Sequence, residues 1–142
     1  MAIKKQVGYY LESTTRHVKL AFTQAFNQAE VDLTPEQWVL LDHLLVQNGL
    51  SQTELAEKSY KNAPTVSRIL DVLERKAYIE RQRFKNDRRR YKIFLTDSGR
   101  AIALKALPIA EQLRQQGWEG LSDDDYNQLI RILGTIFKNF SV

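Results

Sequence analysis

Apolar side chains recur every three or four residues along the first third of the sequence, and this spacing is typical of helices that bury one face. The longest such segment runs from about residue 3 to residue 29. Thr34 and Pro35 then cap and open a second helix, which is expected to end near Asn48 and Gly49 because such a pair commonly stops a helix.

Two short helices joined by a turn are predicted next. Ser51 and Glu54 have the spacing of a capping box, in which each side chain accepts a backbone N–H that the helix leaves free. Asn62 caps the second of these helices, and the proline in its first turn removes no helical hydrogen bond. The apolar stripe of this helix must pack on the preceding helices. It consists of Val66, Ile69, Leu70 and Leu73.

The opposite face of this second helix is small, hydroxyl-bearing and cationic in its N-terminal half. Pro64 and Arg68 lie on it, Thr65 and Ser67 lie on its flanks, and Arg75 follows toward its end. Such a face suits the major groove of DNA, where side chains read the edges of the bases by hydrogen bonding.

Beyond this helix the period changes from helical to alternating, which predicts two β-strands over residues 78–84 and 91–95. Residues 85–90 are predicted to form the tip of the hairpin, with Asn86 and Asp87 starting the reversal.

Positive charge is concentrated in this part of the chain. Residues 75–92 hold nine Lys or Arg against two acids, a local charge of +7, whereas the formal net charge of the whole chain is +4. A cationic hairpin beside a candidate recognition helix is the electrostatic footprint of a DNA-binding surface. The candidate DNA contacts are therefore the helix residues Asn62, Pro64, Thr65, Ser67, Arg68 and Arg75, and the hairpin residues Lys85, Asp87, Arg88, Arg89 and Arg90.

Two more helices are predicted toward the C-terminus. Thr96 caps one that runs to about Gln116, with a bend at Pro108, and Gly117 ends it. Ser122 caps the last helix, which has a broad apolar face that one small domain does not cover. A second copy of the chain is the simplest cover.

Composition narrows the class of protein. With 142 residues, 43% hydrophobic and 27% charged, we expect a soluble globular protein. The absence of cysteine excludes disulfides and thiolate sites and is compatible with the cytoplasm, which is the expected location. We find no targeting segment and no run approaching the roughly 18 apolar residues of a membrane span.

Catalytic and metal-dependent functions are disfavoured. The sequence contains no glycine-rich phosphate loop and no nucleophile elbow. His17 and His43 are its only histidines, and without cysteine they make no convincing zinc set. We therefore expect a protein that is not an enzyme and that needs no cofactor and no metal.

The helix-turn-helix and hairpin resemble those of the MarR family, the multiple-antibiotic-resistance regulators. Asp87-Arg88-Arg89, followed after a strand by Leu95-Thr96 and then Gly99, is similar to the family signature of an acid, a basic residue, an arginine, a strand and LT-x-x-G. Residues 65–68, TVSR, resemble the family's recognition helix, and residues 33–38, LTPEQW, resemble the opening of its second helix. The sequence departs from the family at Ala77 and Tyr60, where glycine is usual or frequent.

This resemblance implies a mainly α fold with a small β-wing. A winged helix-turn-helix domain at 33–96 would lie between dimerisation helices at 1–32 and 97–142. The family's mode of action implies a homodimer on double-stranded DNA with a pseudo-palindromic operator. It also implies that Arg89 enters the minor groove while Asp87 holds it in place.

The resemblance further implies a small-molecule effector, because family members often hold small aromatic acids in a cleft between the dimerisation helices and the winged domain. Arg16 or His17 would meet the carboxylate there, beside Tyr10. Dimer packing and ordinary surface exposure explain most of these residues without an effector.

The sequence thus predicts a homodimeric, sequence-specific DNA-binding regulator of transcription that acts as a repressor. The alternative is a winged-helix module that binds proteins and not DNA. The wing charge and Arg68 on the exposed helix face distinguish the two.

Overall fold

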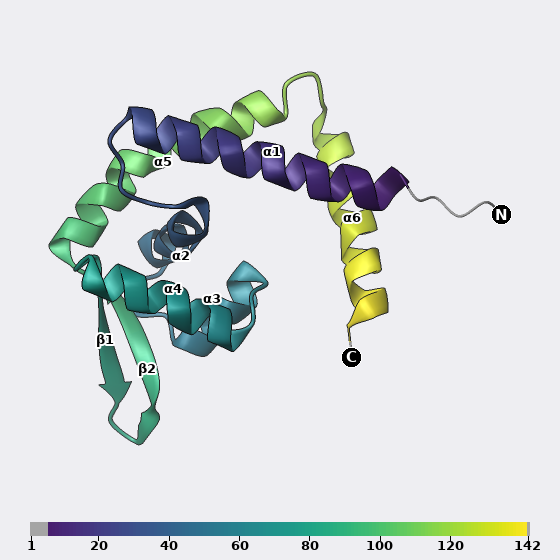
Figure 1. Ribbon diagram of the computed structural model, residues 1–142. Coiled ribbons are helices and arrows are strands. Elements are labelled where there is room, and N and C mark those ends of the chain that lie inside the picture. Colours follow the sequence, from purple (N-terminus) through teal and green to yellow (C-terminus); the bar gives the residue numbers. More distant parts are fainter. Residues whose placement is uncertain (1–5, 142) are drawn as a thin grey trace. The chain divides into compact units, whose positions relative to one another are not determined.

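The computed structural model of the chain describes residues 6–141 (Figure 1). Its elements are α1 (Gln6–Gln28), α2 (Pro35–Val46), α3 (Gln52–Ser59), α4 (Ala63–Arg75), β1 (Ile79–Phe84), β2 (Asp87–Leu95), α5 (Asp97–Gly117) and α6 (Asp123–Phe140). The predicted fold, mainly helical with a small β-wing, is confirmed for these residues. The chain forms two compact units, Met1–Ala110 and Glu111–Val142.

Side-chain caps explain where the helices begin. Complete capping boxes start α2, α3 and α6 at Thr34, Ser51 and Ser122. Asn62 Oδ1 accepts the backbone N–H of Thr65 at 2.9 Å, and Thr96 Oγ1 accepts that of Gly99 at 3.0 Å. These five starts agree with the prediction, because a cap is a local interaction that a short stretch of sequence encodes. The first predicted helix begins at residue 3, which lies outside the described residues.

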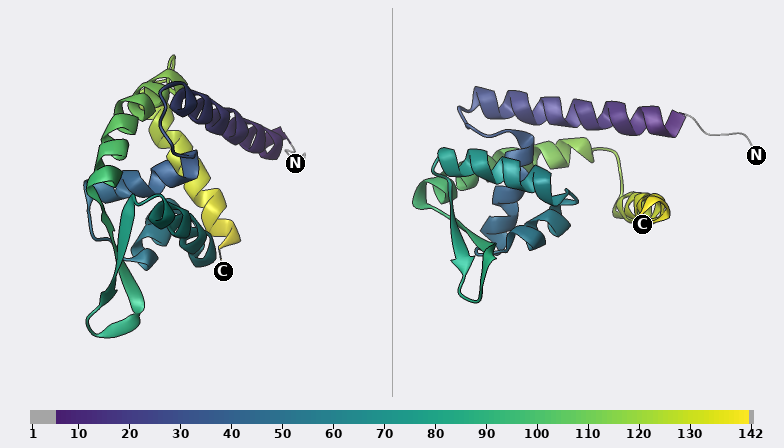
Figure 2. Two further views of the ribbon diagram at one scale, coloured as in Figure 1. Left: turned by 60° about the vertical axis from the view of Figure 1, so that its left-hand side comes forward. Right: turned by 60° about the horizontal axis from the view of Figure 1, so that its bottom comes forward.

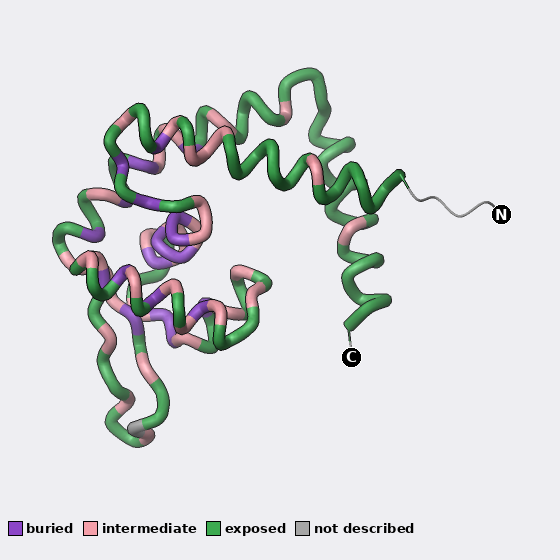
Figure 3. The backbone as a smooth tube through the Cα atoms, viewed as in Figure 1, coloured by how far each residue is buried: buried purple, intermediate pink, exposed green. Residues whose placement is uncertain are grey.

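The core of the first unit lies between α2, α3, α4 and the root of the hairpin, and the end of α1, the segment that follows it and α5 also contribute buried residues (Figure 3). Four side chains of α2 are at most 1% exposed: Trp38, Leu40, Leu41 and Leu44. On α4 the predicted stripe faces this core, with Val66, Leu70 and Leu73 fully buried and Ile69 partly buried. Burial of each such side chain stabilises the fold by roughly 1.5 to 3 kcal/mol relative to its exposure.

The hairpin projects away from α3 and α4, as both views in Figure 2 show. Its strands pair in antiparallel register from Ile79 with Leu95 to Arg83 with Tyr91, and the next pair is Phe84 with Asp87. Residues 88–90 therefore have no partner on β1 and form a bulge in β2.

The prediction that residues 85–90 form the tip of the hairpin is wrong for residues 87–90. Only Lys85 and Asn86 form the turn, and β2 begins at Asp87, so Asp87 and the three arginines after it belong to the strand. A bulge inserts residues that break the alternation of faces. For this reason the strand could not be recognised from a period of two.

The root of the hairpin is also bound to the segment between α2 and α3. The Ile93 N–H donates to the Leu50 carbonyl at 2.8 Å, and the Gly49 N–H donates to the Ile93 carbonyl at 2.9 Å. Ser51, which caps α3, forms an isolated antiparallel bridge with Lys92. The sequence analysis did not foresee this third strand-like segment, which joins α3 to β2.

The first turn of α5 is bound to the connection between α4 and β1. The Ala77 carbonyl accepts hydrogen bonds from Thr96 Oγ1 at 2.6 Å and from Ser98 Oγ at 2.9 Å. Gly99 lies so close to this connection that a Cβ there would be 1.8 Å from the Tyr78 carbonyl oxygen. Only glycine fits at this position without a shift of the backbone.

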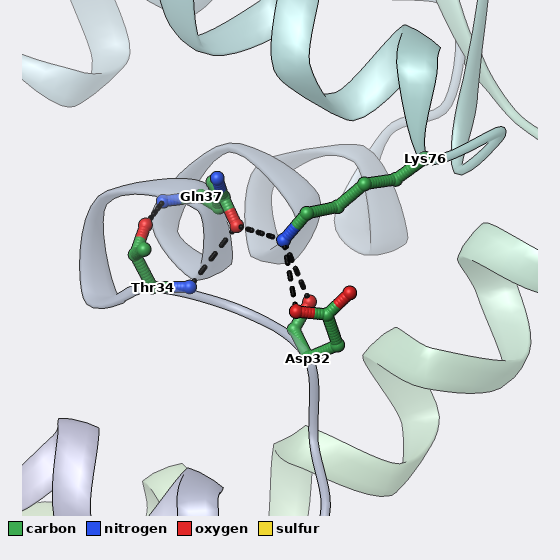
Figure 4. Close-up of polar contacts among 4 residues, drawn as sticks. All are labelled: Asp32, Thr34, Gln37 and Lys76. Atoms are coloured by element: carbon green, nitrogen blue, oxygen red, sulfur yellow. Dashed lines mark hydrogen bonds and ion pairs between the residues drawn. The ribbon is translucent and has the colours of Figure 1, made fainter.

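A buried amide and a lysine connect the end of α4 to the start of α2 (Figure 4). Lys76 Nζ donates to Asp32 Oδ1 at 3.1 Å, to the Asp32 carbonyl at 3.2 Å and to Gln37 Oε1 at 3.2 Å. The same Gln37 oxygen accepts the Thr34 N–H, which completes the capping box of α2. Burial, with a smaller contribution from the Asp32 carboxylate, raises the pKa of the nearby Tyr78 phenol.

The second unit consists of the end of α5 and of α6. The Trp118 and Tyr126 rings meet edge to face, with their centroids 5.1 Å apart. No residue of α6 is buried, and its large apolar side chains are exposed to solvent. The most exposed of them are Phe140, Phe137, Ile130 and Tyr126.

Two non-glycine residues of the winged region have left-handed backbones at the positions where the sequence departs from the MarR family. Tyr60 ends α3 with φ of 56°, and Ala77 follows α4 with φ of 61°. A side chain in this conformation costs roughly 1 to 2 kcal/mol.

Glycine at either position should therefore stabilise the protein. We expect Tyr60→Gly and Ala77→Gly each to raise the free energy of unfolding by about 0.5 to 1 kcal/mol, because the relief of strain exceeds the greater freedom of glycine in the unfolded chain. Urea denaturation monitored by circular dichroism measures this. Ala101→Gly, at an exposed site inside α5, is the control and should destabilise. A lower midpoint for Ala77→Gly than for wild type would contradict the strain argument.

Candidate nucleic-acid interface

The face of α4 opposite its buried stripe is open to a partner. Asn62, Pro64, Arg68 and Arg75 are exposed, while Thr65 and Ser67 are half-buried on the flanks. The Arg68 guanidinium lies 3.4 Å from Thr65 Oγ1, one turn earlier on the same helix. The N-terminal half of α4 therefore presents the small, hydroxyl-bearing and cationic surface that the sequence predicted.

The start of α3 lies beside this surface and is held by its capping box. The Ser51 hydroxyl accepts the Glu54 N–H at 3.0 Å, and Glu54 Oε1 accepts the Ser51 N–H at 3.1 Å. These hydrogen bonds to the backbone and side chain of Ser51 lower the pKa of the Glu54 carboxyl. The start of α3 is therefore most stable when Glu54 is ionised.

A groove of about 740 Å³ lies between α3, α4 and the hairpin. Side chains from all three elements line it: Ser51, Gln52, Thr53, Ala56, Glu57, Lys61, Ala63, Ser67, Asp71, Glu74, Arg81, Arg83, Arg89, Arg90 and Tyr91. The recognition helix, α4, and the wing thus line opposite sides of this groove. Its helical side has hydroxyl groups and three acids, Glu57, Asp71 and Glu74, and its wing side has arginines.

Arg81 connects the two sides of this groove. Its Nη1 lies 2.7 Å from Asp71 Oδ1 and 3.5 Å from Glu74 Oε1, and its Nη2 donates to the Ser67 carbonyl at 3.1 Å. The Arg81 side chain is only 14% exposed, so water competes weakly with these contacts. Since Arg81 belongs to β1 and its three partners to α4, this side chain sets the position of the wing relative to the recognition helix.

The sequence analysis counted Arg81 among the charges of the hairpin but gave it no role. A signal was present: Asp71 and Glu74 lie three residues apart on a face of α4, and Arg81 occupies an inward position of the alternating strand. The sequence did not predict the angle between β1 and α4. This angle depends on the backbone conformation of Ala77, which lies in the connection between them.

Three arginines of the wing, at residues 88–90, lie in the bulge of β2. Asp87 Oδ1 accepts the Arg89 backbone N–H at 2.9 Å, so the aspartate holds the backbone at Arg89. The Arg90 guanidinium carbon lies 4.4 Å from the centroid of the Phe84 ring. Lys85 is exposed in the turn.

The structure brings some of the predicted contacts together and leaves others apart. Ser67, Arg89 and Arg90 line the same groove. Arg75 is in the last turn of α4, at the opposite end of the helix from Asn62. The groove also contains cations that the sequence analysis did not select as contacts: Lys61, Arg81 and Arg83.

The three predicted effector contacts lie on α1. Tyr10 is 70% exposed, Arg16 lies 3.9 Å from Glu12 on the helix surface, and His17 Nδ1 is 3.0 Å from the Ser13 carbonyl oxygen. Tyr10 and His17 are two turns apart and share one face of the helix. Their role in binding an effector stays a prediction.

Over residues 6–141, no three His, Asp or Glu side chains are grouped so as to hold a metal ion. Over the same residues, no helix is long and apolar enough to cross a membrane.

A helix-turn-helix followed by a two-stranded wing defines the winged helix-turn-helix class. Within that class, residues 33–91 match the MarR family, and solved members of the family share the fold over nearly the whole chain. The chain belongs to the MarR family, whose members are DNA-binding regulators of transcription and not enzymes.

Relatives show how far the similarity extends. The HTH-type transcriptional repressor YetL of Bacillus subtilis (strain 168) is 32% identical over 93 residues, which cover 66% of this chain and 56% of that protein. The chain therefore matches little more than half the length of this relative.

Solved structures match over a longer range. S. aureus MepR, in a complex with DNA, is 30% identical with a TM-score of 0.79, over 94% of this chain and 96% of that one. The transcriptional repressor CouR, bound to a 23-mer DNA duplex, is 31% identical with a TM-score of 0.75, over 96% of this chain and 97% of that one.

Replacement of Arg81 should loosen the wing. We expect Arg81→Met to lower the free energy of unfolding by about 1 to 3 kcal/mol, because it removes charge-assisted hydrogen bonds from a mostly buried group. Urea denaturation measures the change. Arg83→Met, an exposed neighbour two residues along the same strand, is the matched control and should change stability by less than about 0.5 kcal/mol. Equal losses for the two variants would show that Arg81 is not the connection.

Proposed function

We propose that the protein binds double-stranded DNA as a homodimer at a pseudo-palindromic operator and represses transcription. One observation carries this proposal: the flank of α4 at Ala63 and Ser67, which adjoins its exposed face, and the arginine-bearing wing line the two sides of a single groove. A recognition helix of this kind reads base edges in the major groove, while the wing reaches the neighbouring backbone and minor groove. The DNA-bound structures of MepR and CouR support it.

Charge supports the same conclusion. The +7 charge of residues 75–92 lies on the end of α4 and on the wing. Lys and Arg at such positions neutralise phosphates and release counterions, which provides most of the sequence-independent affinity for DNA. Proteins that use a winged fold only to bind other proteins have no need of this concentration of cations.

The dimer is proposed from the uncovered apolar faces. On α6, Leu129, Ile130 and Ile136 are 36% to 52% exposed, and on α1 Val18 and Leu20 are 50% and 54% exposed. A soluble monomer rarely exposes contiguous apolar surface of this kind. A second copy would cover both helices and place two recognition helices about 34 Å apart, one turn of DNA.

Half-site spacing tests the dimer and the DNA contact together. Fluorescence anisotropy with the DNA upstream of the protein's own gene should show tight binding to a two-half-site duplex. Insertion of about 5 bp between the half-sites should abolish it, because half a helical turn moves one site to the opposite face. The control is a duplex with a scrambled spacer of unchanged length, which should bind like the operator. Equal affinity for all three duplexes would contradict a specific dimer, and no binding to any of them would favour the protein-binding alternative.

Arg68 and Arg89 should differ in what they read. We expect Arg68→Ala to weaken operator binding by about 1 to 3 kcal/mol and to relax preference at one base pair per half-site, because an exposed arginine on this face of α4 can read a guanine edge. Arg89→Ala should lose most affinity where the flanking minor groove is narrow and A·T-rich. Competition against random duplex and against G·C-substituted flanks measures both. Equal losses on specific and random DNA would make Arg68 a phosphate contact.

We further propose that a small aromatic acid bound near Tyr10, Arg16 and His17 releases the DNA. An effector shifts the equilibrium only by its differential affinity for the two states. An aromatic carboxylate should therefore weaken operator binding, and operator DNA should weaken binding of that acid by the same factor. Titration calorimetry with and without DNA checks this reciprocity, and a panel of aromatic acids with no effect would refute it.

Peroxide is the matched negative control for the effector experiment. The chain has no cysteine, so it has no thiolate that peroxide could oxidise. Its single methionine is Met1, which leaves no internal sulfur to oxidise. Rapid release of DNA by mild peroxide that a reductant reverses would contradict this assignment.

A further inference from the structure

The cations of the wing differ in how they are held. Arg81 is paired with carboxylates, whereas over residues 6–141 no acid side chain is paired with Arg90. Arg90 instead lies over an aromatic face, with its guanidinium carbon 4.4 Å from the centroid of Phe84. Lys92 Nζ is 5.4 Å from the same centroid, so one ring holds two cations.

Phe84 does not belong to the hydrophobic core. It is half-buried at the end of β1, opposite Asp87, next to the bulge that contains the arginines. Strand pairing does not fix the direction of a side chain within a bulge, because the bulged residues have no partner across the sheet. The ring is therefore the contact that orients Arg90.

An aromatic ring and a carboxylate orient an arginine with different electrostatic results. A carboxylate neutralises the cation and accepts the hydrogen bonds that the guanidinium would give to another anion. A ring attracts the cation through its quadrupole and leaves both the net charge and the in-plane N–H donors free. Arg90 is thus held in place and remains able to bind a phosphate.

We propose that Phe84 is a positioning residue for DNA binding, which holds Arg90 over its ring for contact with a backbone phosphate beside the minor groove. This inference rests on the proposed DNA-binding function and assigns different DNA contacts to two arginines of the wing. Arg89, whose backbone is held by Asp87, is the arginine for the minor groove, and Arg90 on Phe84 is an arginine for the phosphate. Preorganisation lowers the entropy lost when the side chain is immobilised on the DNA.

A double-mutant cycle tests the coupling. Phe84→Leu keeps an apolar side chain but removes the ring, and it should weaken operator binding roughly two- to fivefold, the size of an exposed cation–π contact. Arg90→Ala should weaken binding more and reduce the slope of log affinity against log salt by about 1. In the Arg90→Ala background, Phe84→Leu should cause a smaller loss than in the wild type, because Arg90 is missing and only Lys92 remains on the ring.

Two further variants separate positioning from folding. Phe84→Tyr keeps the ring and should bind DNA like wild type. Arg83→Ala in the Phe84→Leu background should give additive losses, because Arg83 lies on Tyr91 and not on Phe84. Thermal unfolding should show that the Phe84→Leu wing remains folded.

The position of Arg90 can be measured without DNA. In NMR spectra of the free protein, ring currents of Phe84 should shift the Arg90 side-chain resonances upfield, and Phe84→Leu should abolish the shift. If the shift is present but the wild-type protein binds no operator, the DNA-binding function itself is wrong. If the protein binds and the losses from Phe84→Leu and Arg90→Ala add, or if the shift is absent, the positioning role of Phe84 is wrong.

Discussion

Burial of the apolar stripe of α4 determines which of its side chains can meet a partner. Val66, Leu70 and Leu73 are fully buried against α2 and α3, and this orients the helix about its own axis. Rotation by one residue would turn Asp71 and Glu74 into the core in place of the leucine side chains that precede them, and this would bury carboxylates and expose apolar surface. The exposed face is thus a consequence of the core, and any function of α4 must use that face.

The wing adopts its position through polar contacts, which the core does not supply. Arg81 connects β1 to three groups of α4, while Ile93 and Lys92 connect β2 to the segment around Ser51. The hairpin is thus held from both of its strands. Lys76 adds a connection from the end of α4 to Asp32. Each element of the groove is therefore joined by polar contacts to another part of the first unit.

How much the sequence predicted depends on the range of the interaction. Caps at Ser51 and Asn62 and the stripe of α4 involve residues within a few positions of each other, and all were confirmed. The pairing of Lys76 with Asp32 joins residues 44 positions apart, and no local pattern encodes it. The bulge at residues 88–90 was missed because it breaks the alternation by which strands are recognised. For the groove, residue types were predictable, but the contact of Arg81 with α4 was not.

Gly99 has a mechanical consequence. The start of α5 touches the carbonyl groups of Ala77 and Tyr78 through two hydroxyl groups and through a glycine with no room for a methyl group. Packing this close resists sliding of α5 along the α4–β1 connection. The start of α5 and the root of the wing should therefore move together as one rigid body. A displacement of α5 would reach the arginines as a rotation of the whole hairpin, with an amplitude that grows toward its tip.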